Sequence, residues 1–144
     1  MREILFRGKL KAENGEFQKG EWVYGDFVTL IDGKEKHPHI YGKGEVKAET
    51  IGQYTGLTDK NGTKIFEGDI VKCTDTQYDY EFIAVVLFGN PNGEYNWGFQ
   101  LKRISGAGVN TDILLWVEME ETGALIEVIG NIHDNPELLK GGAE

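Results

Sequence analysis

The stretch that decides the fold is residues 53–73, which read QYTGLTDKNGTKIFEGDIVKC. Gln53–Leu57 has the composition of a strand, and Asn61-Gly62 suits the positive φ angles of a tight reversal, after which Thr63–Phe66 can return antiparallel. Gly68 then permits a sharp bend because glycine has no Cβ, so the chain can leave as the first strand of another sheet. This stretch therefore predicts a hinge between two β-rich halves.

The composition also favours β structure. The 144 residues include 20 glycines and only 3 prolines, and Val, Ile, Tyr, Phe and Trp are spread through the chain. Such a chain is typical of many short strands joined by glycine-dependent turns. Its length fits one ordinary domain, or two very small domains that share a core. We therefore predict a mainly β protein.

Charge and cysteine content limit the classes of partner and the compartment. The formal net charge of -9 opposes long-range attraction to a phosphate backbone, which disfavours a nucleic-acid partner. An acidic surface that imitates nucleic acid is a second interpretation of this charge, and ordinary solubility is a third.

The only cysteine is Cys73, so no internal disulfide can form. The longest apolar run, Phe82–Phe88, is too short to span a bilayer, and we expect a cytoplasmic protein without a membrane segment.

Alternating apolar residues and turn signals predict the other elements. The first strands are expected at Ile4–Phe6, on a sheet edge, and at Glu21–Ile31, which ends in a reversal at Asp32-Gly33. His37–Tyr41 and Glu45–Gln53 are expected to form the next hairpin. The expected elements after the hinge are strands Asp69–Thr74, Tyr80–Phe88 and Tyr95–Lys102, a loop Ile104–Asp112, strands Ile113–Glu120 and Ala124–Ile132, and a helical turn at Pro136–Lys140, capped by Asn135.

Two pairs of segments echo one another. Trp22–Val28 is similar to Ile65–Val71, and Glu49–Gln53 is similar to Glu127–Asn131. Duplication of one unit and chance similarity of short β motifs both explain the echoes. We predict two small barrel-like β units, residues 1–64 and 65–144, of which the second is SH3-like and ends in a short C-terminal helical turn. Together they would form a single compact domain.

Several separated motifs resemble those of the YopX-like family of bacteriophage and prophage proteins. The motifs occur in order along nearly the whole chain, and support is weakest between Tyr78 and Glu121. They are Arg2–Lys9, Trp22–Gly25, Gln53–Leu57, Asp59–Gly62, Glu67–Val71 and Val128–Leu138. The resemblance implies a small, mostly β, phage-encoded cytoplasmic protein, without an established molecular activity and without family catalytic residues to assign here.

Three histidines raise the question of a metal site. His37 and His39 lie two apart, so on a strand they would share a face and could hold one ion. Glu45 or His133 would have to supply a third ligand, and neither has diagnostic spacing. Pro38 between the histidines indicates a loop or sheet edge. The simpler interpretation is surface histidines, and we predict no metal and no cofactor.

Other candidates for catalysis have simpler structural interpretations. Cys73 falls in an expected strand, where a buried apolar thiol is more usual than an activated one. Asp26 and Asp69 each follow a glycine at a bend, where a carboxylate commonly accepts bonds from nearby backbone N–H groups, although paired carboxylates can also act as acid and base. Gly106-Ala107-Gly108 lacks the spacing of a phosphate loop, and no helix is expected after it. We therefore predict no enzymatic activity.

An interaction surface is the function that these patterns favour most. Tyr78 and Tyr80 lie among acidic residues in an expected loop, where SH3-like barrels display contact residues, and Trp97 or Trp116 could border it. Core packing is the alternative for all four aromatic residues.

Three hypotheses about function follow. The first is a non-enzymatic protein whose β surfaces bind copies of itself, as a homo-oligomer, or a host or phage protein partner. The second is a nucleic-acid module that uses the SH3-like half. The third is a small metal-dependent hydrolase, which would need a deep pocket with several convergent polar side chains.

Overall fold

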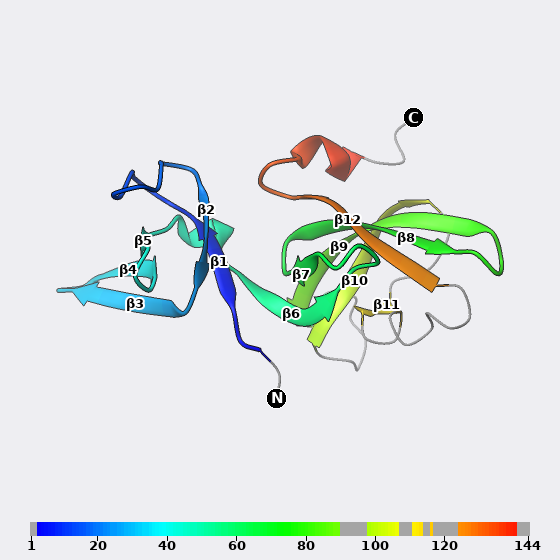
Figure 1. Cartoon of the computed structure of the whole chain (residues 1–144), viewed down its shortest axis with the longest axis horizontal. Coiled ribbons are helices and arrows are strands. Elements are labelled where there is room, and N and C mark those ends of the chain that lie inside the picture. Colours follow the sequence, from blue (N-terminus) through cyan, green and yellow to red (C-terminus); the bar gives the residue numbers. More distant parts are fainter. Residues whose placement is uncertain (1–2, 90–97, 107–110, 114–115, 117–123, 141–144) are drawn as a thin grey trace. The chain divides into compact units, whose positions relative to one another are not determined.

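The protein is mainly β, with its strands arranged in antiparallel sheets (Figure 1). The computed structural model describes residues 3–89, 98–106, 111–113, 116 and 124–140. The chain separates into two compact units, residues 1–56 and 57–144. The predicted division into domains after residue 64 stays a prediction.

The first unit contains two small sheets. Its elements are β1 Phe6–Lys9, β2 Trp22–Gly25, β3 Phe27–Asp32, β4 Glu35–Ile40, β5 Gly44–Glu45, the 3₁₀ helix η1 Ala48–Thr50 and the start of β6 Gly52–Thr58. β1 pairs with β2 on one side and with β6 on the other. Strands β3, β4 and β5 form the second sheet in that order.

Several predicted boundaries in the first unit are wrong. The predicted edge strand Ile4–Phe6 is wrong because β1 begins at Phe6 and has a neighbour on both sides. The predicted single strand Glu21–Ile31 breaks at Asp26 into β2 and β3, which belong to different sheets. At this break Gly25 packs closely, since a Cβ there would lie 3.1 Å from Ile40 Cγ2. The predicted strand Glu45–Gln53 is interrupted by η1.

The core of the first unit is small. Four side chains are fully buried in it, and three more pack against them; they are Leu10, Val23, Ile40 and Val46, with Phe6, Phe17 and Ile51. Gly8 allows the close approach of β1, because a Cβ there would lie 3.0 Å from the side chain of Val46. Of the β3–β4–β5 sheet, only Ile40 belongs to this cluster, so most of β3 receives no cover from the core.

The second unit is built on a five-stranded antiparallel sheet. Its strands follow the order β11-β10-β9-β8-β12, and among the described residues no pairing between β11 and β12 closes it. The elements are β7 Lys64–Phe66, β8 Asp69–Asp75, β9 Tyr80–Gly89, β10 Gly98–Gly106, β11 Thr111–Asp112, β12 Ala124–Asn131 and the 3₁₀ helix η3 Pro136–Lys140. The strands predicted at β8, β9 and β12 and the predicted C-terminal helical turn are confirmed, and β8 pairs with β9.

The segment before β12 differs from the prediction. β10 continues through Gly106, and Thr111–Asp112 form β11, so the predicted loop Ile104–Asp112 is wrong at both ends. Ile113 and Trp116 have helical backbone conformation rather than the predicted strand conformation. Both side chains lie in the core of the second unit. β12 pairs with β8.

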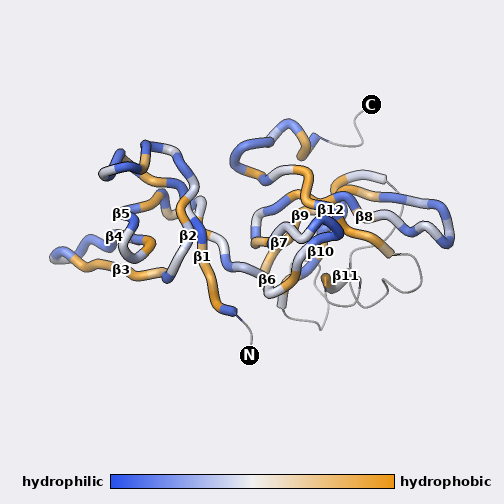
Figure 2. The backbone as a smooth tube through the Cα atoms, in the orientation of Figure 1, coloured by the Kyte–Doolittle hydropathy of each residue, from blue (hydrophilic) through white to orange (hydrophobic). Residues whose placement is uncertain are grey.

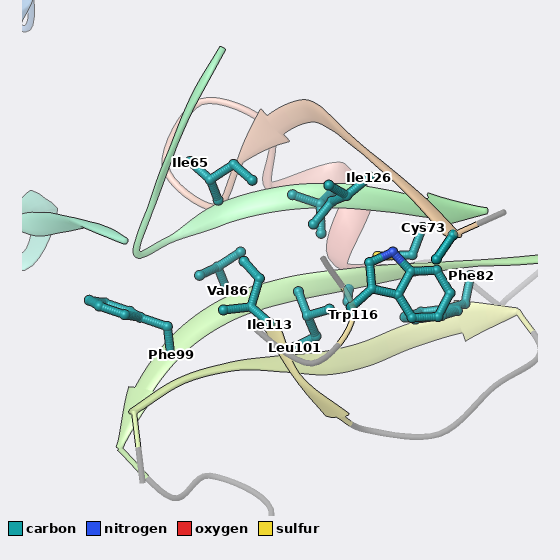
Figure 3. Packing of buried hydrophobic residues seen from close by; sticks show 12 residues of the cluster. Ile65, Cys73, Phe82, Val86, Phe99, Leu101, Ile113, Trp116 and Ile126 are labelled. Carbon is teal, nitrogen blue, oxygen red and sulfur yellow. The ribbon is translucent and has the colours of Figure 1, made fainter. Parts of the chain in front are cut away.

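One cluster forms the core of the second unit (Figure 3). It is made of residues from β7 to β10, from β12 and from the helical segment, namely Ile65, Val71, Cys73, Phe82, Ala84, Val86, Phe99, Leu101, Ile113, Trp116, Ala124 and Ile126. The Trp116 indole meets the ring of Phe82 edge to face, with centroids 5.2 Å apart. Its Nε1 donates to the Leu125 carbonyl at 2.9 Å, which satisfies the polar atom of a buried aromatic side chain.

Two carboxylates hold the reversal and the bend that the sequence predicted at Asp59–Gly62 and at Gly68. Gly62 and Gly68 adopt φ of +82° and +93°, as the reversal and the bend require. Asp59 Oδ1 accepts bonds from the N–H groups of Asn61 and Thr63, both at 2.9 Å. Asp69 Oδ2 accepts from Phe66 N at 2.7 Å. Both turns are thus fixed by buried side-chain acceptors.

Candidate functional site

His37 lies between two carboxylates on the β3–β4–β5 sheet. Its Nδ1 is 3.1 Å from Glu45 Oε2, and its Nε2 is 3.4 Å from Glu35 Oε2. Glu45 also pairs with Lys11, whose Nζ lies 3.3 Å from the same oxygen. A neutral imidazole has one N–H, so only the doubly protonated ring can donate to both carboxylates. The arrangement is a network of polar contacts that joins β4 to β5, with an ion pair between Lys11 and Glu45.

An open cavity of about 460 Å³ lies beside this network. Lysines and carboxylates share its lining, which consists of Lys11, Glu35, Lys36, His37, Pro38, Glu45, Val46, Lys47, Ala48 and Glu49. Because the lining carries three lysines and three glutamates, it forms neither a basic face for phosphate nor an acidic cradle for a cation.

One contact that the metal hypothesis required is present, but the described residues do not form a metal site. The structure does bring His37 to Glu45, which the sequence offered as a third ligand. His133 lies in the second unit. Among the described residues no group of three or more His, Cys, Asp or Glu side chains is arranged to hold a metal ion. Pro38 lies within β4 rather than in the predicted loop or edge, because its missing N–H faces the short strand β5.

The contacts of Glu45 change its acidity. The hydrogen bond from His37 lowers the pKa of this carboxyl below its ordinary value of 4.5, with further lowering from Lys11. A carboxylate held in this way stabilises the fold while it is ionised.

The predicted interaction tyrosines differ in exposure. Tyr78 lies in the turn between β8 and β9 and is 71% exposed. Asp75 Oδ1 shapes this turn by accepting bonds from the N–H groups of Gln77 and Tyr78. Tyr80 begins β9 and packs against the core cluster, so its ring is half-buried. The loop therefore presents one exposed aromatic ring rather than a pair.

Of the two predicted tryptophans, Trp116 does not extend that surface. Trp116 is 3% exposed and belongs to the core, so the alternative of core packing holds for it. Trp97 lies outside the described residues.

The other catalytic candidates have structural roles or surroundings. Cys73 is buried in β8, and burial raises the pKa of its thiol to about 12, which opposes formation of the nucleophilic thiolate. The Asp69 carboxylate is committed to Phe66 N, whereas Asp26 lies exposed in the first unit. In Gly106-Ala107-Gly108, Gly106 ends β10 and the other two residues lie outside the described ranges.

The outer edge of β3 is the most unusual surface of the first unit. β3 pairs with β4 through the register Phe27↔Ile40 to Asp32↔Glu35, and no strand among the described residues pairs its other side. Tyr41 N donates to Asp26 O at 2.8 Å, so in this register Val28 and Leu30 also bond to β4. Phe27, Thr29 and Ile31 alternate with them and direct their N–H and C=O groups away from β4.

This edge is also apolar on both faces. Ile31 is 69% exposed and Leu30 is 50% exposed, and Phe27 is 39% exposed although it contacts the Phe6 ring. Figure 2 shows β3 largely in hydrophobic colours and the turn at its end as hydrophilic. From Phe27 to Ile31 the strand carries no charge, while Asp26 and Asp32 flank it. Open, uncharged, apolar edges are uncommon in soluble proteins because they pair with other strands.

Comparison with protein families decides the classification of the chain. The family described as YopX protein matches residues 8–140, which is nearly the whole chain. The chain belongs to the YopX family. No curated protein sequence is significantly similar to this YopX-family chain. Within the part of the chain that the structure describes, no helix is long and apolar enough to cross a membrane.

The late motif that resembled YopX-like proteins shapes a turn in this YopX-family chain. Asn131 Oδ1 accepts bonds from the N–H groups of His133 and Asp134, at 3.0 and 2.9 Å. Asn135 Oδ1 in turn accepts from Asn131 N at 3.2 Å. A Cβ on Gly130 would lie 2.5 Å from that same oxygen, so the turn requires glycine there. The motif therefore has a structural explanation that involves no catalysis.

Sequence reasoning missed the β3 edge in this YopX-family protein. It predicted one strand from Glu21 through Ile31 and did not place that strand at the edge of a sheet. The signal that could have revealed the edge is the partner strand, since Glu35, Lys36 and His37 are too polar to cover Leu30 and Ile31.

Proposed function

We propose that this YopX-family protein is a non-enzymatic interaction module that binds protein strands at the β3 edge. The edge observation carries the proposal: Phe27, Thr29 and Ile31 direct backbone groups away from β4, and exposed apolar side chains accompany them. An added strand would bond those groups and cover the side chains, which is recognition by sheet extension.

The occupant we propose first is another copy of the chain, which makes the protein a homo-oligomer. A host or phage protein that offers an extended segment is the other occupant of this kind. Tyr78 stays a candidate contact residue for such a partner, because its ring is exposed in the second unit. Family membership supports a phage or prophage origin, and the single cysteine supports action in the cytoplasm of a bacterial host.

The second unit supports a finer fold proposal. Its five-stranded antiparallel sheet around one core is compatible with an SH3-like barrel, although function would not follow from that likeness. The absence of enzymatic activity is likewise a proposal. It is supported by the raised pKa of the Cys73 thiol and by the mixed charges of the cavity lining.

Light scattering of the purified protein tests the proposal. We expect a discrete multimer whose population rises with protein concentration. Ile31→Lys should shift the protein to the monomer, because a lysine on an edge strand opposes pairing. Tyr78→Ala is the matched control at another exposed apolar residue and should leave the mass unchanged. A monomer at every concentration would contradict self-association, and a multimer that survives Ile31→Lys would place it elsewhere.

A further inference from the structure

We propose that β3 pairs with β3 of a second copy, antiparallel and centred on Leu30. This inference rests on the proposed function, since it names the occupant of the β3 edge and the register in which it binds. Two identical edges can pair only about a two-fold axis, so one residue must lie opposite itself or the axis must fall between two residues.

The direction of the backbone groups limits the register. Only Phe27, Thr29 and Ile31 direct N–H and C=O groups outward. These odd-numbered residues must therefore bond to odd-numbered residues of the partner, which places a single residue on the axis. Val28, Thr29 or Leu30 can occupy that position with the uncharged segments of the two strands overlapping. Centring on Val28 would set Ile31 opposite Gly25, which already belongs to β2 in the other sheet, so Thr29 and Leu30 remain.

Charge decides between the two registers. Centring on Thr29 would set Asp26 of each copy opposite Asp32 of the other, which brings like charges together at both ends. Centring on Leu30 sets Asp26 opposite Lys34 of the other copy, twice by symmetry. Neither Asp26 nor Lys34 has an ion-pair partner among the described residues, and both are exposed. Opposite charges placed across two strands stabilise their pairing, whereas like charges destabilise it.

Side-chain fit favours the same register. Leu30, half exposed in the monomer, would face the other Leu30 at a non-hydrogen-bonded position, where side chains lie closest. Thr29 would lie opposite Ile31 and exchange backbone bonds with it. Phe27 would lie opposite Gly33. A Cβ added to Gly33 would meet no atom within 4 Å, so the glycine leaves room for the ring.

Cysteine cross-linking tests the register. Leu30→Cys should form a disulfide-linked dimer under mild oxidation with oxidised glutathione, because the two thiols would face each other. Thr29→Cys should cross-link at least about tenfold more slowly, since its counterpart would be displaced by two residues, roughly 6.6 Å along the strand. The native Cys73 is buried, so the wild-type protein serves as the control without cross-linking.

A charge exchange provides an independent test. Asp26→Lys and Lys34→Asp should each weaken self-association about fivefold at low salt. The double variant should restore it to within about twofold of the wild type, because the pairs are re-formed with reversed sign. Thermal melting of each variant checks that the monomer fold is retained.

The outcomes separate this inference from the proposed function. Rapid Leu30→Cys cross-linking with rescue by the double charge variant supports the Leu30 register. Faster cross-linking of Thr29→Cys would overturn that register and leave self-association through β3 in place. A multimer in which neither cysteine cross-links would overturn β3–β3 pairing, while a protein that is monomeric throughout would overturn both proposals.

Discussion

Strands β12 and β3 both lie at the end of an antiparallel sheet, but only β12 is covered along its outer side. Asp59 Oδ2 accepts a bond from Val128 N at 2.9 Å, and Lys60 N donates to Ile126 O at 3.0 Å. The hinge turn thus occupies the edge of β12. Along β3, no described residue does the same. The second unit thus covers the β12 end of its sheet from within, whereas the outer side of β3 has no strand neighbour among the described residues, which supports the proposal that another chain pairs there.

The largest loss of stability should come from a substitution in the core of the second unit. We expect Trp116→Ala to lower the free energy of unfolding by about 4 kcal/mol, because it removes a fully buried ring from the core. Leu30→Ala, in the open strand, should change the stability of the monomer by less than about 0.5 kcal/mol. Chemical denaturation of dilute protein measures both. Similar losses for the two variants would mean that β3 is covered within the monomer.

Uncovering β12 should have the next largest effect. Asp59→Ala removes the acceptor of three backbone N–H groups, and we expect a loss of about 3 kcal/mol in the free energy of unfolding. Asp75→Ala is the matched control. Its carboxylate accepts two N–H bonds within its own turn and holds no sheet edge, so the loss should be about 1 kcal/mol. Equal losses would show that the contact with Val128 does not stabilise the unit.

Proline substitutions should distinguish the side of β3 that bonds to β4 from its outer side. Val28→Pro removes an N–H directed at β4 and should cost about 3 kcal/mol in monomer stability. Thr29→Pro removes an N–H directed outward, so it should cost less than about 1 kcal/mol and still abolish self-association. Urea denaturation and light scattering measure the two effects. The reverse order of stability losses would contradict the pairing deduced from the Tyr41–Asp26 bond.

The smallest effect concerns the ion pairs of β5. Because the pKa of Glu45 is lowered in the folded state, its contacts stabilise the protein above the ordinary value of 4.5 and are lost as the pH falls through the folded value. The stability difference between wild type and Glu45→Gln should therefore shrink as the pH falls below the ordinary value of 4.5. Urea denaturation above and below this value checks it, and a constant difference would mean that ionisation of Glu45 does not matter.

Local signals in the sequence predicted most of the second unit. Gly62 and Gly68 located the reversal and the bend because both positions need positive φ angles, and alternating apolar residues located β8, β9 and β12. Ile113 and Trp116 were misassigned because a short apolar run suits a buried helical turn as well as a strand. The contact between His37 and Glu45 was only one of two options that the sequence left open, since it depends on the turn between β4 and β5.

The β3 edge could not be predicted in the same way. Whether a strand has one neighbour or two depends on tertiary pairing, which alternation of residue types does not encode. The break at Asp26 transfers the chain from one sheet to the other, and it is this transfer that leaves Phe27–Ile31 at an edge.

Residue-resolved amide hydrogen exchange at low and high protein concentration tests the central claim most directly. In dilute protein the amides of Val28 and Leu30 should be protected, while those of Thr29 and Ile31 exchange rapidly. At high concentration Thr29 and Ile31 should gain protection as a second copy accepts their bonds. If the mass rises with concentration while these two amides continue to exchange rapidly, the chain associates through another surface and β3 is not its interaction edge.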